Sequence, residues 1–482
     1  MGTNSAVCGS LEYGVRGGLL VGLVAPLPAL VAFLTYGALE APDSGGYIYY
    51  AEQLRTGTLP SGTALLKEAP APISLFRTAG YPTIIAVTQL FFGAAWKPTL
   101  VLLQIAAHAA LAVTVYRTAV LLRLSRSLAI LVALLPSMGL GLVMQISVLT
   151  DAISAALLGF AALWLVQATL RPSTLAPVAV GMALAGAMLL REATMFIAVG
   201  FAPAVWIASR PKSRVRWLCS AFMPIIAVVA GMAGTNYARS GYPVVTTSPQ
   251  LVMVQALLPL LKHELPVFDG EDLYDRTARD TLRGGEYAMI DELNRKLFLA
   301  GLTAPQMAEA ATRRYFRAWW RFPGAMFIAT VSRYRVDFQA LAFYPLITLR
   351  YLAIYAGTPR PEFTAPARLW KKLRRGNLSA GAWFLVDVAM RVIGTAIGLA
   401  AAAAPFLLKN QHDDRSRVSL GTWLICVSCV AVYIPVHLDI RYLVPLIPLY
   451  CLLAATLWDA FRPPEKASRE SPPLDVCSER PF

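Results

Sequence analysis

Long apolar segments alternate with short polar connections along most of the chain. The first runs from Gly17 to Gly37, and similar segments follow at short intervals. A helix needs about 20 apolar residues to cross a bilayer, whereas the strands of a membrane β-barrel are short and alternate in polarity. The pattern therefore predicts an all-α polytopic membrane protein with about ten transmembrane helices.

Most of the expected crossings can be placed directly on the sequence. We expect 17–37 to be an uncleaved signal anchor, and 83–92 to be too short to cross, as an interfacial or re-entrant helix. Residues 338–356 are apolar but carry Arg350, so the sequence leaves open whether they cross. The other expected spans are 98–116, 128–145, 152–170, 174–190, 194–209, 218–234, 382–408, 418–436 and a last one that ends near Phe461.

Polarity divides the chain into four predicted parts. Residues 1–235 form an N-terminal transmembrane core, which includes a catalytic first outer loop at 38–97. Residues 236–380 are more polar and contain Trp and Arg together, which is typical of helices that lie at a membrane interface. Residues 381–461 form the C-terminal transmembrane helices, and 462–482 form a disordered cytoplasmic tail.

The distribution of charge predicts the orientation in the membrane. The chain carries 43 Lys and Arg against 28 Asp and Glu, a net charge of +15, yet only 15% of its residues are charged. Arginines gather in the connections after 116, 170 and 209, and cytoplasmic loops of membrane proteins collect such charges. The basic character therefore indicates cytoplasmic loops and no nucleic-acid partner, and it places the alternate connections outside the cytoplasm.

Charged residues at the outer ends of the apolar segments are the candidate site. Asp43 begins a short helix in the first outer loop, where the helix dipole favours an ionised carboxylate. Asp43, Arg77, Asp151 and Arg441 each lie at the outer end of a different segment. Two carboxylates and two guanidiniums can thus converge on one cavity at the membrane surface. Asp387 and Arg391 lie four residues apart within one span and favour a structural ion pair instead.

Several other site types find no support in the sequence. It contains no Walker loop, no HExxH, no GxSxG and no paired CxxC motifs. Cys426 and Cys429 form a CxxC inside an apolar run, where cysteines are expected to pack as small apolar residues.

Four short motifs occur in order along the chain. They are Asp43-x-x-x-Tyr47-x-x-x-Ala51-x-x-Leu54-x-x-Gly57, Arg77-x-x-Gly80-Tyr81-Pro82, Leu149-Thr150-Asp151 and Arg441-Tyr442-x-x-Pro445. Together they resemble the GT-C superfamily of membrane glycosyltransferases, above all its protein mannosyltransferase, aminoarabinose transferase and rhizobial lipopolysaccharide galacturonosyltransferase types. The chain departs from this pattern at Ser44, where many relatives have Glu, and at Ala79, where they have Pro.

The resemblance implies a GT-C-like helix bundle with extracytoplasmic juxtamembrane helices. It implies an enzyme that takes a sugar from a polyprenyl-phosphate donor and transfers it to a protein, a lipopolysaccharide or another envelope glycan. The expected location is a bacterial inner membrane, with the site on the extracytoplasmic face. Because the sequence shows Asp43 without a second acid nearby, we expect inversion at the anomeric carbon.

The resemblance also implies roles for individual residues. Asp43 and Asp151 are the expected catalytic carboxylates, and Arg77 and Arg441 the expected ligands of the donor phosphate. No cofactor is established, and a divalent metal is left open, with Asp43 and Asp151 as its ligands. The residues expected to line the substrate cavity are Tyr47, Tyr81, Arg191 and Tyr442.

Two other functions stay open at this point. A transporter or flippase of a lipid-linked sugar would also place charges near the membrane, although most of these charges lie at one face. A non-catalytic membrane subunit would use the aromatic and basic residues near Trp319 to bind a partner.

Overall fold

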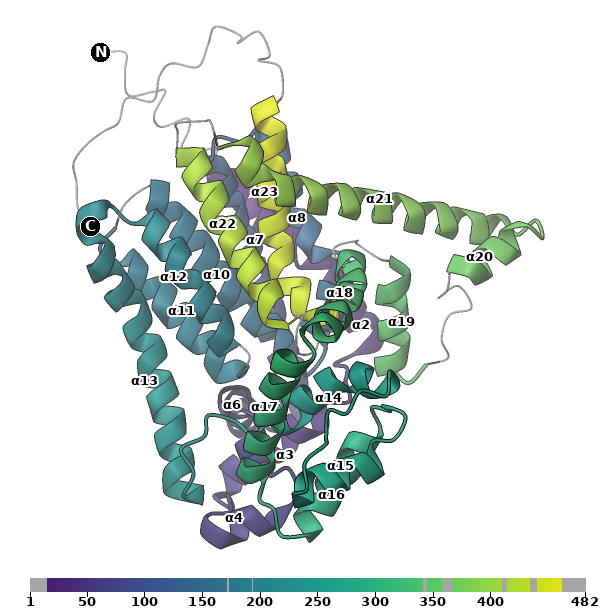
Figure 1. Ribbon diagram of the computed structural model, residues 1–482. Helices are drawn as coiled ribbons and strands as arrows, with labels where there is room; N and C mark the ends of the chain where they lie inside the picture. The colour runs from purple at the N-terminus through teal and green to yellow at the C-terminus, as the bar shows by residue number, and fades with distance from the viewer. Residues whose placement is uncertain are drawn as a thin grey trace, which may run out of the picture.

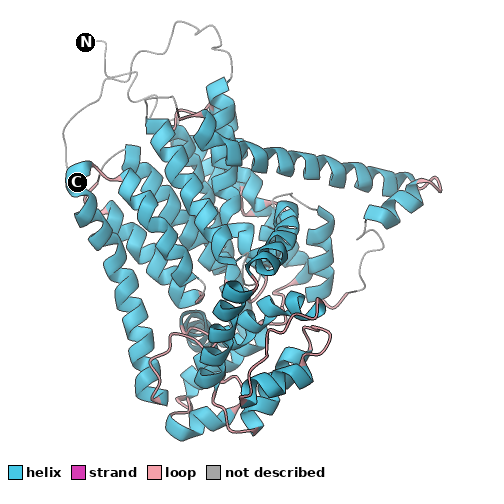
Figure 2. Ribbon diagram, viewed as in Figure 1, coloured by secondary structure: helices cyan, strands magenta, loops and turns pink. Residues whose placement is uncertain are grey.

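The computed structural model describes residues 15–170, 173–192, 194–340, 345–358, 366–409, 414–433 and 440–461. Within these ranges every regular element is a helix, and extended backbone pairs only in an isolated parallel bridge between Leu39 and Ser147 (Figure 2). The all-α prediction is confirmed for this part of the chain. The predicted tail at 462–482 lies outside the described residues.

The first half of the chain supplies the outer loop and most of the bundle. Its helices are α2 (Leu27–Tyr36), α3 (Ser44–Thr56), α4 (Gly62–Glu68), α5 (Ile73–Phe76), α6 (Gly80–Phe92), η1 (Gly93–Ala95), α7 (Trp96–Leu121), α8 (Arg126–Leu134), η2 (Leu135–Ser137), α9 (Leu140–Ile146), α10 (Asp151–Leu170), α11 (Ala176–Leu190), α12 (Thr194–Ala208), η3 (Pro211–Ser213) and α13 (Arg214–Ser240).

The second half adds an outer unit and returns to the bundle. Its helices are α14 (Pro249–Lys262), α15 (Leu273–Thr281), α16 (Met289–Leu299), α17 (Ala304–Arg321), α18 (Pro323–Ala340), α19 (Pro345–Tyr355), α20 (Pro366–Leu373), α21 (Leu378–Leu407), α22 (Asp414–Tyr433), η4 (Ile440–Leu446) and α23 (Ile447–Phe461).

Six helices in the described part are long and apolar enough to cross a membrane, so the chain is an integral membrane protein. The pair α8–α9 would be a seventh crossing, but its two parts meet at an angle of 58°. The sequence predicted one continuous span at 128–145. The six are Val15–Tyr36, Gly80–Leu121, Asp151–Leu170, Pro211–Ser240, Leu378–Leu407 and Leu443–Phe461.

Shorter helices account for part of the difference from the predicted ten. α11 and α12 match two predicted spans but have 15 residues each, fewer than the ~20 of a full crossing. The 26 residues of α7 suffice for a crossing, so the prediction that α6 does not cross stays a prediction. α19, with 11 residues, is too short to cross alone, and residues 341–344 before it lie outside the described residues.

Helices α10 to α13 lie side by side in the bundle (Figure 1). α10 packs against α7 and α11, α11 against α13, and α12 against α22. The crossing of α11 and α13 is close, because a Cβ on Gly181 would lie 2.2 Å from the carbonyl oxygen of Ala221. Elsewhere, in α21, Arg391 donates to Asp387 at 2.6 Å, so the predicted ion pair is confirmed.

The two ends of α13 separate the main basic cluster from the first outer loop. The helix begins within the cluster Arg210, Lys212, Arg214 and Arg216. Its 27 residues span about 40 Å at 1.5 Å per residue. At the far end, Arg239 donates to the carbonyl of Pro60 at 2.9 Å. The first outer loop therefore lies on the opposite side of the bundle from this cluster.

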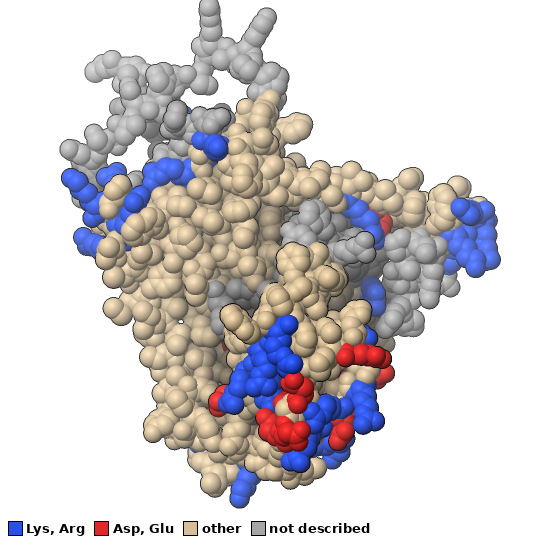
Figure 3. Space-filling model, viewed as in Figure 1, with Lys and Arg blue, Asp and Glu red and all other residues tan. Residues whose placement is uncertain are grey.

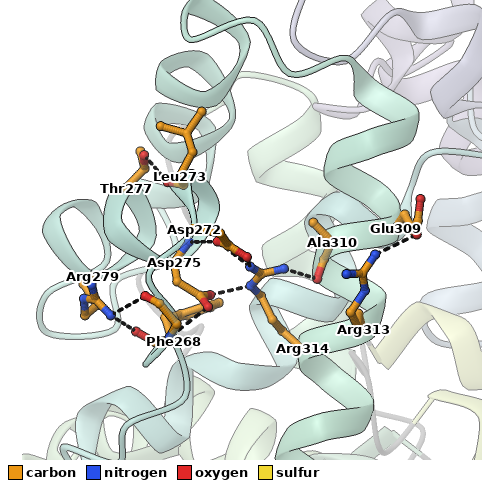
Figure 4. A network of polar contacts seen from close by, with 11 residues as sticks. Phe268, Asp272, Leu273, Asp275, Thr277, Arg279, Glu309, Ala310, Arg313 and Arg314 are labelled. Atoms are coloured by element: carbon orange, nitrogen blue, oxygen red, sulfur yellow. Dashed lines mark hydrogen bonds and ion pairs between the residues drawn. The ribbon is translucent and has the colours of Figure 1, made fainter.

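Helices α14 to α18 form an outer unit with a hydrophobic core of its own. Its main polar link joins α15 to α17 around Arg314, whose side chain is 4% exposed (Figure 4). Arg314 donates to the carboxylates of Asp275 and Asp272, the latter at 2.7 Å. Burial lowers the pKa of Arg314, but the hydrogen bonds and charges of these two carboxylates raise it overall. Arg314 therefore stays charged inside the unit.

Candidate active site

The first outer loop is bound to the chain just before α10. Leu39 forms its parallel bridge with Ser147. A few residues later, the hydroxyl of Ser44 donates to the carbonyl oxygen of Val148 at 2.7 Å. Ser44 is buried, so water does not compete for this hydrogen bond. These contacts bring the loops that carry the two predicted catalytic carboxylates to the same end of the bundle.

Arg77 joins two acids from different parts of the chain. Its Nη2 lies 3.1 Å from Oδ1 of Asp43, at the start of α3, and its Nη1 lies 3.7 Å from Oε1 of Glu192, between α11 and α12. All three side chains are partly buried. The predicted meeting of Asp43 and Arg77 is thus found in the structure, and Glu192 joins it.

Asp151 pairs with Arg191 in the same region. Arg191 Nη1 donates to Asp151 Oδ1 at 2.7 Å, and the carboxylate is almost completely buried, at the first residue of α10. A buried carboxylate needs such a partner, because an unpaired buried charge is costly. Since Arg191 and Glu192 are neighbours in sequence, the short connection between α11 and α12 contacts Asp151 directly and reaches Asp43 through Arg77.

Two tyrosines support the charged groups from below. The ring of Tyr47 meets that of Tyr81 edge to face, with centroids 5.3 Å apart, and the guanidinium of Arg77 lies 5.3 Å from the Tyr47 centroid. The hydroxyl of Tyr81 donates to Gln104 at 2.9 Å. Both rings are buried. Tyr47 thus contacts the guanidinium, Tyr81 supports Tyr47, and their hydroxyl groups have little contact with solvent.

The electrostatic environment of Tyr47 shows that these groups lie close together. Burial raises the pKa of Tyr47 above its usual value, and the guanidinium of Arg77 lowers it in part. Three carboxylates raise it further, those of Glu192, Asp43 and Asp151. Tyr47 therefore stays a neutral phenol at physiological pH, beside Arg77 and three acids.

The chain after α13 holds the segment that carries Arg77. Thr246 donates to the carbonyl of Phe76 at 2.8 Å, and the backbone N–H of Thr247 donates to the carbonyl of Leu75 at 2.9 Å. Because Phe76 directly precedes Arg77, these bonds determine where the guanidinium can lie. The outer unit thus contributes indirectly to the site.

Two predicted site residues cannot be placed in this arrangement. Arg441 and Tyr442 belong to η4, but their side chains lie outside the described part of the structure. Conversely, Glu192 was not predicted. The sequence signal was present, since Arg191-Glu192 is a charged pair between two apolar helices on the side of the other candidates. With Glu192 bound to the same arginine, Asp43 is no longer an isolated carboxylate.

The described side chains do not form a ready metal centre. No group of three or more His, Cys, Asp and Glu residues in the described ranges could hold a metal ion. The predicted ligands, Asp43 and Asp151, each pair with an arginine instead. A divalent ion at these two residues stays a prediction.

A close helix contact at Gly80 gives a first test of this geometry. A Cβ at Gly80 would lie 2.3 Å from the carbonyl oxygen of Leu189, so Gly80→Ala should push α6 away from the end of α11. We expect a loss of about 1–3 kcal/mol of stability from overpacking. Activity should drop as well, because Arg77 lies three residues before Gly80 and Glu192 three residues after Leu189. Thermal unfolding and transfer assays would measure both.

Gly45→Ala is the matched control, since nothing lies within 4 Å of its new Cβ. Equal stability and activity of the two variants would contradict the prediction.

Comparisons with known proteins add one structural likeness. No protein-family model and no curated protein matches the chain. Among solved structures, the chain is similar to the oligosaccharyltransferase of Archaeoglobus fulgidus in its apo form, with a TM-score of 0.49 and 12% sequence identity. The match covers 91% of this chain and 50% of that one, so the chain spans about half the length of that enzyme.

Proposed function

We propose that the chain is a glycosyltransferase of the GT-C type, which transfers a sugar from a polyprenyl-phosphate donor to an extracytoplasmic acceptor. The observation that carries this proposal is the group of Asp43, Arg77 and Glu192, with the pair Asp151–Arg191 beside it. These five side chains come from four connections of the chain and meet at one end of a membrane-spanning bundle. Such a site suits a substrate with a phosphate at headgroup level.

Arg77 would bind the phosphate of the donor. A guanidinium can bind a phosphate with two parallel hydrogen bonds, and a phosphate leaving group needs positive charge as its bond to the sugar breaks. The contact of Arg77 with Glu192, at 3.7 Å, is longer than its contact with Asp43. We therefore expect Glu192 to give way to the donor phosphate. Arg441 is proposed as a second phosphate ligand.

Asp43 would act as the general base. The acceptor hydroxyl attacks the anomeric carbon, the bond from that carbon to the phosphate oxygen breaks, and the phosphate leaves with the bonding electrons. Asp43 accepts the proton of the hydroxyl during this attack. Asp151, held by Arg191, would orient a sugar hydroxyl. A single displacement inverts the anomeric centre. A second acid close to Asp43, such as Glu192, is the arrangement that a retaining double displacement uses, so NMR of the product would distinguish inversion from retention.

Arg191 and Tyr442 are proposed to line the substrate cavity. Tyr47 and Tyr81, expected to line it too, are buried, so we assign them to the layer that supports Arg77 rather than to the cavity surface. The acceptor would be a protein, a lipopolysaccharide or another envelope glycan, in a bacterial inner membrane. Support for an extracytoplasmic site comes from α13, because its basic start and the first outer loop lie at opposite ends of this helix.

Sugar transfer by reconstituted protein tests the proposal. Wild type and Arg77→Gln would receive radiolabelled polyprenyl-phosphate sugars one at a time, with a membrane extract as acceptor. We expect wild type to move label from one donor, and Arg77→Gln to be about 10²–10³-fold slower, from the loss of charge stabilisation at the leaving group.

Arg55→Gln is the matched control, because Arg55 lies in the same outer loop and pairs only with the exposed Glu52 in the described contacts. It should transfer label as wild type does. Movement of the donor across the bilayer without covalent transfer would instead indicate a flippase. No transfer from any donor by folded wild-type protein would contradict the proposed function.

A further inference from the structure

Helix α17 has one face that no other described residues cover. Its opposite face packs into the outer unit through residues such as Met307, Ala311 and Ala318. The uncovered residues recur every three to four positions, so they form one stripe along the helix. We call it the basic-aromatic stripe; it consists of Arg313, Phe316, Arg317, Trp320 and Arg321.

The aromatic side chains of the stripe are unusually exposed. Trp320 is 89% exposed and Phe316 is 62% exposed. Large apolar side chains in water forgo the burial energy that they gain in an apolar environment, about 1.5–3 kcal/mol each. Exposed aromatic groups beside arginines are typical of a surface that binds a partner or a membrane.

The charge of the stripe is highest at its centre. Arg313 pairs with Glu309 at 2.8 Å, and Arg321 pairs with Asp269. For Arg317, between them, the described residues provide no ion pair or hydrogen bond. Figure 3 shows the group of basic side chains over α17, with acidic side chains against one side of it and uncharged surface on the side toward α18. Arg317 interacts with the carboxylate of Asp269 only through its charge, so its guanidinium keeps its hydrogen-bond donors for a ligand between the two exposed rings.

The next helix, α18, links the stripe to two candidate membrane spans. α18 packs against α21 and η4; α21 is a candidate span, and η4 runs into another. The exposed side chains of α18 include Phe327, Ile328 and Val331. Because α18 follows α17 directly, its exposed apolar side chains lie between the stripe and these candidate spans.

We propose that the basic-aromatic stripe docks on the surface of the same membrane and binds anionic phospholipid headgroups. Arg317 contacts a lipid phosphate, while Phe316 and Trp320 lie at headgroup level, where amphipathic aromatic rings collect. The apolar surface of α18 continues into the acyl region. The sequence predicted interfacial helices in this region; selectivity for anionic lipid, centred on Arg317, is new. It does not depend on the proposed enzymatic function.

Docking of the stripe would also affect the candidate active site. α17 packs against α14, and the segment just before α14 binds the backbone of the Arg77 loop through Thr246 and Thr247. An outer unit held at the membrane surface thus restrains that loop from one side.

Fluorescence quenching in nanodiscs tests the inference. Full-length protein would be reconstituted in phosphatidylcholine alone or with phosphatidylglycerol, each with lipids brominated near the headgroup end of the acyl chain. The chain has ten tryptophans, so the fluorescence of Trp320 is taken as the difference between wild type and Trp320→Phe. We expect the Trp320 signal to be quenched, and more strongly with phosphatidylglycerol. Arg317→Gln should remove the increase caused by the anionic lipid.

Arg283→Gln is the matched control, because Arg283 is an exposed arginine of the same unit that pairs with Asp280. It should behave as wild type does. A Trp320 signal that neither lipid quenches would overturn the inference, and so would equal quenching in the two lipids. A dimer in nanodiscs that Arg317→Gln dissociates, with Trp320 unquenched, would assign the stripe to a second copy of the chain instead.

Discussion

An Asp43→Asn variant should transfer sugar about 10²–10⁴-fold more slowly than the wild type, the usual contribution of a general base. Asparagine keeps the shape of the side chain but cannot accept the proton of the acceptor hydroxyl. Folding should persist, because Ser44, not Asp43, makes the buried bond to Val148, and Arg77 keeps Glu192. Steady-state kinetics with the donor found for the wild type would show a fall in kcat, with the KM for donor little changed.

Glu40→Gln is the matched control for Asp43. Glu40 is an acid of the same loop, half exposed and paired with Lys97, so its loss should leave transfer unchanged. The contrast with Arg77→Gln is equally informative, because loss of the phosphate ligand should raise the KM for donor. An Asp43→Asn enzyme with a kcat close to that of the wild type would contradict the role of Asp43 as base.

The sequence could predict which residues meet, because the membrane limits where they can be. Charges at the outer ends of apolar segments are confined to one surface, which predicts that Asp43, Arg77, Asp151 and Arg441 converge and that Arg191 lies on the same side. The side chain of Arg441 lies outside the described part of the structure, and the comparison concerns Asp43, Arg77, Asp151 and Arg191. The structure brings the four together in two ion pairs.

The partners within the site could not be predicted in the same way. Sequence order alone does not say that Arg77 pairs with Asp43 and Arg191 with Asp151. The bridge of Leu39 to Ser147, which joins the two loops, also leaves no local sequence signal. Glu192 lies in the connection between the predicted spans 174–190 and 194–209, next to the candidate Arg191, but it matches none of the four motifs.

The number of crossings was the least predictable part of the fold. Apolar length alone predicted 128–145 as one span, yet the chain bends by 58° between α8 and α9. Pro136 and Gly139 lie at this bend; proline cannot continue the hydrogen bonds of a helix and glycine accepts a positive φ, here 77°. Pro136 and Gly139 are therefore the sequence signal for a broken helix, which a prediction from apolar length alone does not take into account.

The second large effect is expected in the outer unit, where Asp275→Asn would leave the charge of Arg314 poorly compensated. Asp275 is 1% exposed and binds both Arg314 and the backbone N–H of Gly270. Removing one partner of a buried ion pair costs about 3–5 kcal/mol, and we expect the lower end of that range because Asp272 still binds Arg314. Hydrogen exchange should then be roughly 10²-fold faster in α15 and α17, at 1.4 kcal/mol per factor of ten, while α10 in the bundle stays protected. Asp280→Asn is the matched control, because Asp280 lies on α15 in an exposed ion pair and its loss should change hydrogen exchange little. If both variants are protected from exchange to the same degree, the apolar core of the unit holds α15 against α17, and the ion pairs of Arg314 do not.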